Sequence, residues 1–233
     1  MYRFSNFIFI LFFWCCFAEA AEKKEIGNKP TYRFSGDAQL LTQFLDRGLS
    51  ITDGNPGLNT SFLFNLGQQF RLGFWGSNVS NVTSSDDNLW LKFIADINIE
   101  FNPESIFMGY IHDDNYYKSD LRNGQAFGMT YDFKSYMTQI EWQTNYQGTG
   151  TGAFYLKVGK VFPLYKKILP GVFLGYTVQN SDGYLNYFDL KGTAIYTLTS
   201  SFDLEGGITA VTNSTQFGRR GEPAVYVGIK LNY

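Results

Sequence analysis

His112 is the only histidine of the chain, and Asp113 and Asp114 follow it directly. A serine hydrolase needs a serine within hydrogen-bond reach of its histidine and a third group that orients the ring, and no local spacing selects such a serine. Successive strand residues point to opposite faces, so this triplet makes a poor metal site. The pattern favours a solvated histidine at the base of a loop. We therefore predict no catalytic residue, no metal and no cofactor.

A larger set of ionisable residues occupies every second position of otherwise apolar segments. An unpaired charge in a dry core costs several kcal/mol, so these side chains need water or one another. We expect them to line a water-filled lumen, where their nearly balanced signs predict weak ion selectivity. The set comprises Arg71, Lys92, Asp96, Glu100, Glu141, Lys157, Asp189, Lys191, Asp203, Glu205 and Lys230.

The segments that carry these charges have the period of β-strands. Residues 89–101 read LWLKFIADINIEF, in which leucine, phenylalanine, alanine and isoleucine alternate with mainly polar residues. This run is longer than a typical strand of about 5–6 residues and suits the tilted strands, about 9–11 residues long, that cross a bilayer. A membrane barrel would turn the apolar face outward to lipid and the charged face inward.

About twelve such segments recur, and short turns alternate with longer polar loops between them, as in an outer-membrane barrel. We predict an all-β fold, a closed antiparallel transmembrane β-barrel of about 12 strands. The turn at 163–170 (PLYKKILP) is irregular, and we expect a small helical cap there. The predicted strands are 38–49, 57–66, 69–78, 88–101, 105–112, 125–133, 135–144, 153–162, 171–180, 184–198, 201–212 and 222–233.

Aromatic residues make up 18% of the chain and cluster near the predicted strand ends, which predicts two girdles at the membrane interfaces. The girdle at the long loops would contain Trp75, Trp90, Trp142 and Tyr184. The girdle at the short turns would contain Phe70, Phe101, Phe133, Tyr136, Phe162, Tyr196, Phe202 and Tyr233.

The N-terminus reads as an export signal. Residues 1–20 combine Arg3, an apolar run and the small-x-small pattern Ala18-Glu19-Ala20, as in a secretory signal peptide. Polar residues 21–36 would form a periplasmic lead-in, and 37–233 the barrel. Both cysteines lie in the expected signal, so the exported part would contain no disulfide.

Composition excludes two other classes. A mean hydropathy of −0.18 is too low for a bundle of membrane-spanning helices. A net charge of −2 and the lack of a basic block argue against nucleic acid as a partner.

The last strand carries a further signal. Its apolar face ends on an aromatic residue, which resembles the C-terminal recognition strand of outer-membrane barrels and makes the barrel-assembly machinery an expected partner. The face comprises Val225, Val227, Ile229, Leu231 and Tyr233.

Residues 41–79 resemble the opening of the TorF-type porin family of Proteobacteria. That family begins with an aromatic residue followed by Arg-Gly, then a polar turn with a proline, a second strand and a Trp-small-Ser-Asn-Val ending. The matching residues are Phe44, Arg47, Gly48, Pro56, Trp75, Ser77 and Asn78. The resemblance implies an outer-membrane barrel with pore activity and no particular substrate. We expect Arg47 to organise loops near the extracellular end of strand one.

The favoured hypothesis is a porin in the outer membrane of a Gram-negative bacterium that allows passive diffusion of small hydrophilic solutes or ions. Outer-membrane lipids and lipopolysaccharide would surround it. One alternative is a structural or adhesive barrel whose lumen is plugged by side chains such as Trp90 and Tyr187. Another alternative is a barrel hydrolase that uses His112.

Overall fold

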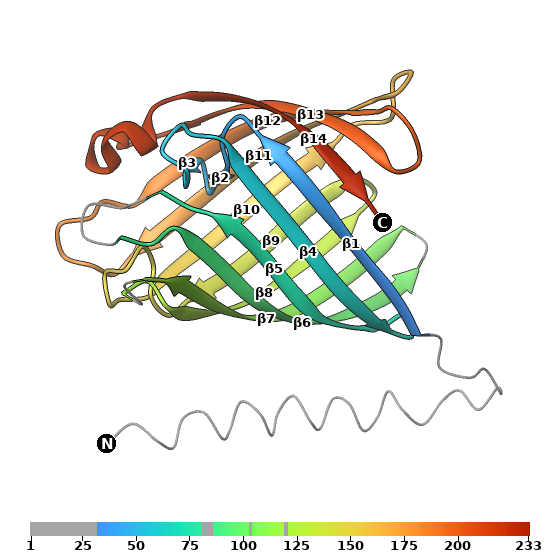
Figure 1. Ribbon diagram of the computed structural model, residues 1–233, viewed down its shortest axis with the longest axis horizontal. Coiled ribbons are helices and arrows are strands. Elements are labelled where there is room, and N and C mark those ends of the chain that lie inside the picture. The colour runs from blue at the N-terminus through green and yellow to red at the C-terminus, as the bar shows by residue number, and fades with distance from the viewer. Residues whose placement is uncertain (1–31, 81–85, 103, 119–120) are drawn as a thin grey trace, which may run out of the picture. The chain divides into compact units, whose positions relative to one another are not determined.

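The computed structural model describes residues 32–80, 86–102, 104–118 and 121–233. The expected signal peptide and residues 21–31 of the expected lead-in lie outside these ranges. Twelve antiparallel strands form a closed barrel in which β1 pairs with both β4 and β14 (Figure 1). The fold predicted from the alternating pattern is thereby confirmed.

The barrel strands follow one another around the wall in chain order. They are β1 (Tyr32–Leu41), β4 (Gly57–Leu66), β5 (Phe70–Asn78), β6 (Leu89–Asn102), β7 (Ser105–Tyr117), β8 (Gly124–Phe133), β9 (Tyr136–Gln143), β10 (Ala153–Val161), β11 (Ile168–Gln179), β12 (Tyr187–Thr197), β13 (Phe202–Val211) and β14 (Ala224–Asn232). Closure pairs backbone groups that an open sheet would leave unpaired, as a hydrocarbon environment requires.

The two ends of the barrel differ. The longer connections gather at one end, on the left of Figure 1, together with a 3₁₀ segment, η1 (Ser214–Gly221), and the short β2 (Leu45–Asp46) and β3 (Leu49–Ser50). We call this the long-loop end and the opposite one the short-turn end. Among the helices of the described residues, none is long and apolar enough to cross a membrane.

Apolar side chains cover the outside of the barrel. On β5, Leu72 and Phe74 are about half exposed, while Arg71 on the same strand faces the interior and bonds Asp96. The same alternation leaves Leu174 of β11 exposed. The exterior is therefore apolar and the interior charged, which is the reverse of the arrangement in a soluble barrel.

The predicted first strand, 38–49, is wrong in its bounds. β1 begins at Tyr32, before the expected barrel start at 37, and ends at Leu41. The rest of the range forms the β2–β3 hairpin, whose turn residues Arg47 and Gly48 have φ angles of 45° and 78°. Positive φ at both central residues is typical of the tight type I′ turn of a two-residue hairpin.

Three further expectations are corrected. The turn at 163–170 is no helical cap, because Tyr165 and Ile168 pair through their backbones and β11 begins at Ile168. Trp75 and Trp90 do not belong to the expected girdle. The pleat of β5 and β6 points both rings into the barrel, where they line its cavity. His112 lies inside β7 and not at the base of a loop, since that strand continues to Tyr117.

Candidate functional site

The barrel encloses a polar cavity of about 680 Å³. Seven of the eleven predicted lumen residues line it: Arg71, Lys92, Asp96, Glu141, Lys157, Asp189 and Lys191. They come from β5, β6, β9, β10 and β12, where period-2 alternation sends charged side chains inward. The cavity is therefore a candidate route for polar solutes.

The four other predicted lumen residues lie outside this cavity. Glu205 accepts hydrogen bonds from Gln39 and Tyr226 at 2.7 Å each. The remaining three are Lys230, 3.0 Å from Asp37; Asp203, bonded to Asn232 at 2.9 Å; and Glu100, which is exposed.

Most cavity charges are paired across neighbouring strands. Arg71 donates two hydrogen bonds to Asp96, at 2.8 and 2.5 Å. Lys92 lies 3.8 Å from the buried carboxylate of Asp114. These pairs compensate carboxylates that would otherwise be buried without a counter-charge.

Lys157 and Lys191 differ from these paired charges. Neither ammonium has an ion-pair partner within 4.0 Å among the described residues. Each instead faces an aromatic ring, Lys157 that of Phe173 at 5.8 Å and Lys191 that of Tyr226 at 5.0 Å. Both lysines line the cavity, so their charges are available to a solute.

Residues 42–56, with the β2–β3 hairpin, fold inward over the long-loop end of this cavity. Leu49 is fully buried and packs with Tyr146 and Tyr187. Ile51 packs on the other side with Trp90 and is 2% exposed. We call residues 42–56 the lumen segment, and its burial narrows the opening at the long-loop end.

Arg47 at the tip of the lumen segment reaches the opposite wall. Its guanidinium forms an ion pair with Glu141 of β9. It also lies over two tyrosine rings, 4.7 Å from the centroid of Tyr146 and 4.7 Å from that of Tyr155. Burial raises the pKa of the Tyr146 hydroxyl above its ordinary value. Arg47 thus bridges segments of the fold, besides belonging to the cavity lining.

The residues that resemble the TorF-type family lie around the lumen segment. The ring of Phe44 lies 5.5 Å from that of Trp75. Asn78 donates a hydrogen bond to the carbonyl of Pro56 at 2.9 Å, and Ser77 is buried beside it on β5. Phe44 and Pro56 thus hold the base of the segment against β5, whereas Arg47 at its tip contacts β9 and β10.

His112 lies beside an ion pair inside the barrel. Its Nε2 is 3.3 Å from Asp96, and its ring stacks on that of Tyr110 with centroids 4.5 Å apart. Within the described ranges, no three histidine, cysteine, aspartate or glutamate side chains come together as a metal site would require.

Two residues that line the cavity, Tyr155 and Asp114, are absent from the predicted lumen set. Alternation alone predicts the first, because Tyr155 stands two positions before the predicted Lys157 and so shares its face. Asp114 was missed because the strand was predicted to end at His112, whereas β7 continues to Tyr117. Its carboxylate accepts hydrogen bonds from the Trp90 indole and from Gln143.

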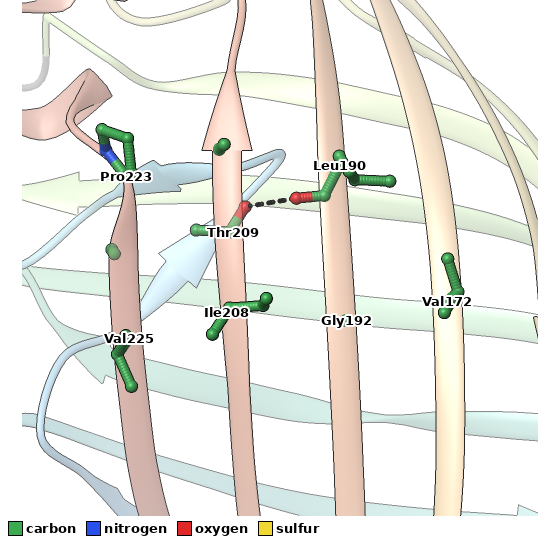
Figure 2. Close-up of a pocket in the computed structure, with 9 residues that line it drawn as sticks. Val172, Leu190, Gly192, Ile208, Thr209, Pro223 and Val225 are labelled. Atoms are coloured by element: carbon green, nitrogen blue, oxygen red, sulfur yellow. Dashed lines mark hydrogen bonds between the residues drawn. The ribbon is translucent and has the colours of Figure 1, made fainter.

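A second, apolar hollow of about 430 Å³ lies on the outer face of β11–β14 (Figure 2). Val172, Leu190, Ile208 and Val225 surround it. The hydroxyl of Thr209 is already bonded to the Leu190 carbonyl at 3.1 Å. The hollow belongs to the apolar exterior and has little chemistry to offer a polar solute.

No family model matches the chain, and no curated protein is significantly similar to it. Solved structures do resemble its fold. The KdgM porin is 10% identical, with a TM-score of 0.60 over 85% of this chain and 99% of that chain. The same porin in complex with disordered oligogalacturonate gives 10% identity and a TM-score of 0.59 over the same shares. The chain is thus similar to solved porins in its fold, a closed barrel of twelve antiparallel strands.

Proposed function

We propose that this chain is an outer-membrane porin that allows passive diffusion of small hydrophilic solutes or ions. One observation carries the proposal: a closed barrel presents apolar side chains outside and a charged, partly unpaired cavity inside. Lipid favours such an exterior, and water or polar solutes favour such an interior. Lys157 and Lys191 would contact passing solutes.

The proposed solutes are small because the lumen segment narrows the long-loop end. Membership of the TorF-type family is part of the proposal and is supported by the motif residues that surround this segment. We further propose export by the signal peptide at 1–20, assembly by the barrel-assembly machinery, and contact with outer-membrane lipids and lipopolysaccharide.

Conductance in planar lipid bilayers tests the pore. The full chain is refolded, and a heat-modifiable gel shift shows that it is folded. It should then give discrete conductance steps in KCl at roughly 1 M, where the Debye length is about 3 Å and surface charge is screened. A refolded sample that inserts without conducting would overturn the pore. An unfolded sample prepared in parallel controls for detergent leaks.

A second candidate is a structural or adhesive barrel with a plugged lumen. The burial of Leu49 and Ile51 favours it, because the lumen segment occupies the opening. A variant in which residues 45–50 are replaced by glycine and serine distinguishes the two candidates. If the native chain is silent and only this variant conducts, the native barrel is plugged.

We propose no enzymatic activity. Within the described part of the chain, His112 makes no hydrogen bond to a serine side chain, and its neighbours are Asp96 and Tyr110. A hydrolase would need that serine contact. If an esterase assay with a chromogenic acyl ester detects turnover that His112→Ala abolishes, this part of the proposal is wrong.

A further inference from the structure

The side chain of Arg47 occupies a cage on the barrel wall. Glu141 supplies a carboxylate, and the guanidinium lies over the rings of Tyr146 and Tyr155, with both centroids 4.7 Å away. A carboxylate with two flanking aromatic faces is a favourable environment for a planar cation. The cage would therefore attract guanidinium groups other than that of Arg47.

The carboxylate of the cage is positioned without help from the lumen segment. Glu141 accepts a hydrogen bond from the Tyr110 hydroxyl at 2.5 Å. Gln139 donates to the same tyrosine oxygen at 2.8 Å. These contacts join β7 and β9, so Glu141 would keep its place if Arg47 were absent.

Both rings of the cage are also held by the wall. The hydroxyl of Tyr146 shares a 2.5 Å hydrogen bond with that of Tyr187, which is fully buried. Tyr155 donates to Asp189 at 3.3 Å. Tyr146 also packs against Leu49 of the lumen segment, so the rings are held without the Arg47 side chain. Sites that are preformed in this way bind without a large ordering cost.

Arg47 itself fills the cage incompletely. Its side chain is buried, yet its Nη1 has no hydrogen-bond partner in the described part of the chain. A buried guanidinium nitrogen without a partner costs free energy. A free ligand, without the constraint of a hairpin turn, could orient its nitrogens better.

The geometry points to a guanidinium-binding site made by Glu141, Tyr146 and Tyr155, which Arg47 occupies as an internal ligand. Small solutes that carry a guanidinium group would compete with Arg47 for it. The inference rests on the proposed function only in that such solutes must reach the lumen. A solute that takes the cage removes the contact that fixes the tip of the lumen segment.

The test uses the full chain, refolded in detergent micelles, and Arg47→Ala, which empties the cage. Methylguanidinium is the probe, and methylurea is the control, since it has nearly the same shape and no charge. Isothermal titration should show methylguanidinium binding to Arg47→Ala at least about tenfold more tightly than to the native chain, and about tenfold more tightly than methylurea binds. Adding Glu141→Gln to Arg47→Ala should weaken the binding at least about tenfold.

Arg47→Gln, tested in parallel, keeps a polar side chain in case the alanine variant fails the gel-shift test of folding. Equal binding of methylurea, or unchanged binding after Glu141→Gln, would overturn the inference. Binding in micelles does not depend on ion flow. If the barrel binds methylguanidinium but never conducts, the guanidinium site is therefore supported and the proposed pore is wrong.

Discussion

Gly48, at the tip of the lumen segment, lies directly against Val211 of β13. A Cβ atom at Gly48 would be 2.4 Å from Val211 Cγ1 and 2.7 Å from the Cβ of Asp189. The φ angle of Gly48 is 78°, which disfavours other residues as well. The turn therefore fits against the wall here only because Gly48 has no side chain.

We expect Gly48→Ala to displace the lumen segment and raise the single-channel conductance. The clash moves the tip off the wall, and the positive φ adds a cost of about 1–3 kcal/mol. Gly150→Ala is the matched control, since Gly150 has a φ of 72° and nothing within 4 Å of its Cβ position. Conductance that rises equally in both variants, or in neither, would contradict a narrowing by the lumen segment.

The sequence predicted the barrel well because its wall depends on local alternation. Each strand repeats the same two-residue pattern, so an error in one strand end does not affect the next. Trp90 illustrates this: its place near a strand end predicts a girdle, its place in the alternation of 89–101 predicts the inner face, and in the structure it lines the cavity. Alternation was the stronger signal.

The lumen segment could not be predicted from the same pattern. Its first residues continue the pattern of the predicted strand 38–49, and the chain turns back at Arg47 and Gly48, whose φ angles are positive. The partner of Arg47, Glu141, is 94 residues away in the sequence. No local spacing encodes such a contact, so the sequence could place both residues near the lumen but could not join them.

The unpaired lysines should control ion selectivity. Changing both Lys157 and Lys191 to glutamate reverses two charges that line the cavity without ion-pair partners. The ratio of cation to anion permeability should rise by at least about threefold, since charge near a pore sets the local ion concentration. The reversal potential in a KCl gradient measures this ratio. Lys134→Glu, at an exposed surface position, is the control and should leave it unchanged.

The ion pair between Arg71 and Asp96 should stabilise the barrel. Arg71→Met leaves the Asp96 carboxylate, 2% exposed, with His112 as its remaining close partner. The expected loss is about 1–3 kcal/mol in the free energy of unfolding, measured by urea titration in vesicles. Adding Asp96→Asn should recover part of this loss, because the buried charge is gone. The free energies of unfolding lost by Arg71→Met alone and by Asp96→Asn alone provide the comparison. If the double variant loses their sum, the two residues are not coupled.

The orientation of the wall toward lipid is testable with one charge on either face. Leu174 is half exposed near the middle of β11, whereas Met137 of β9 lines the cavity. Arginine on a lipid face near the bilayer midplane costs about 2–4 kcal/mol, whereas a lumen position can hydrate it. Leu174→Arg should therefore reduce the folded fraction in phospholipid vesicles, as read from the heat-modifiable gel shift. Met137→Arg should fold nearly as well as the native chain and change its conductance instead. Equal folding of the two variants, or a greater loss for Met137→Arg, would mean that the apolar face does not meet lipid, and the proposed pore would then lose its main support.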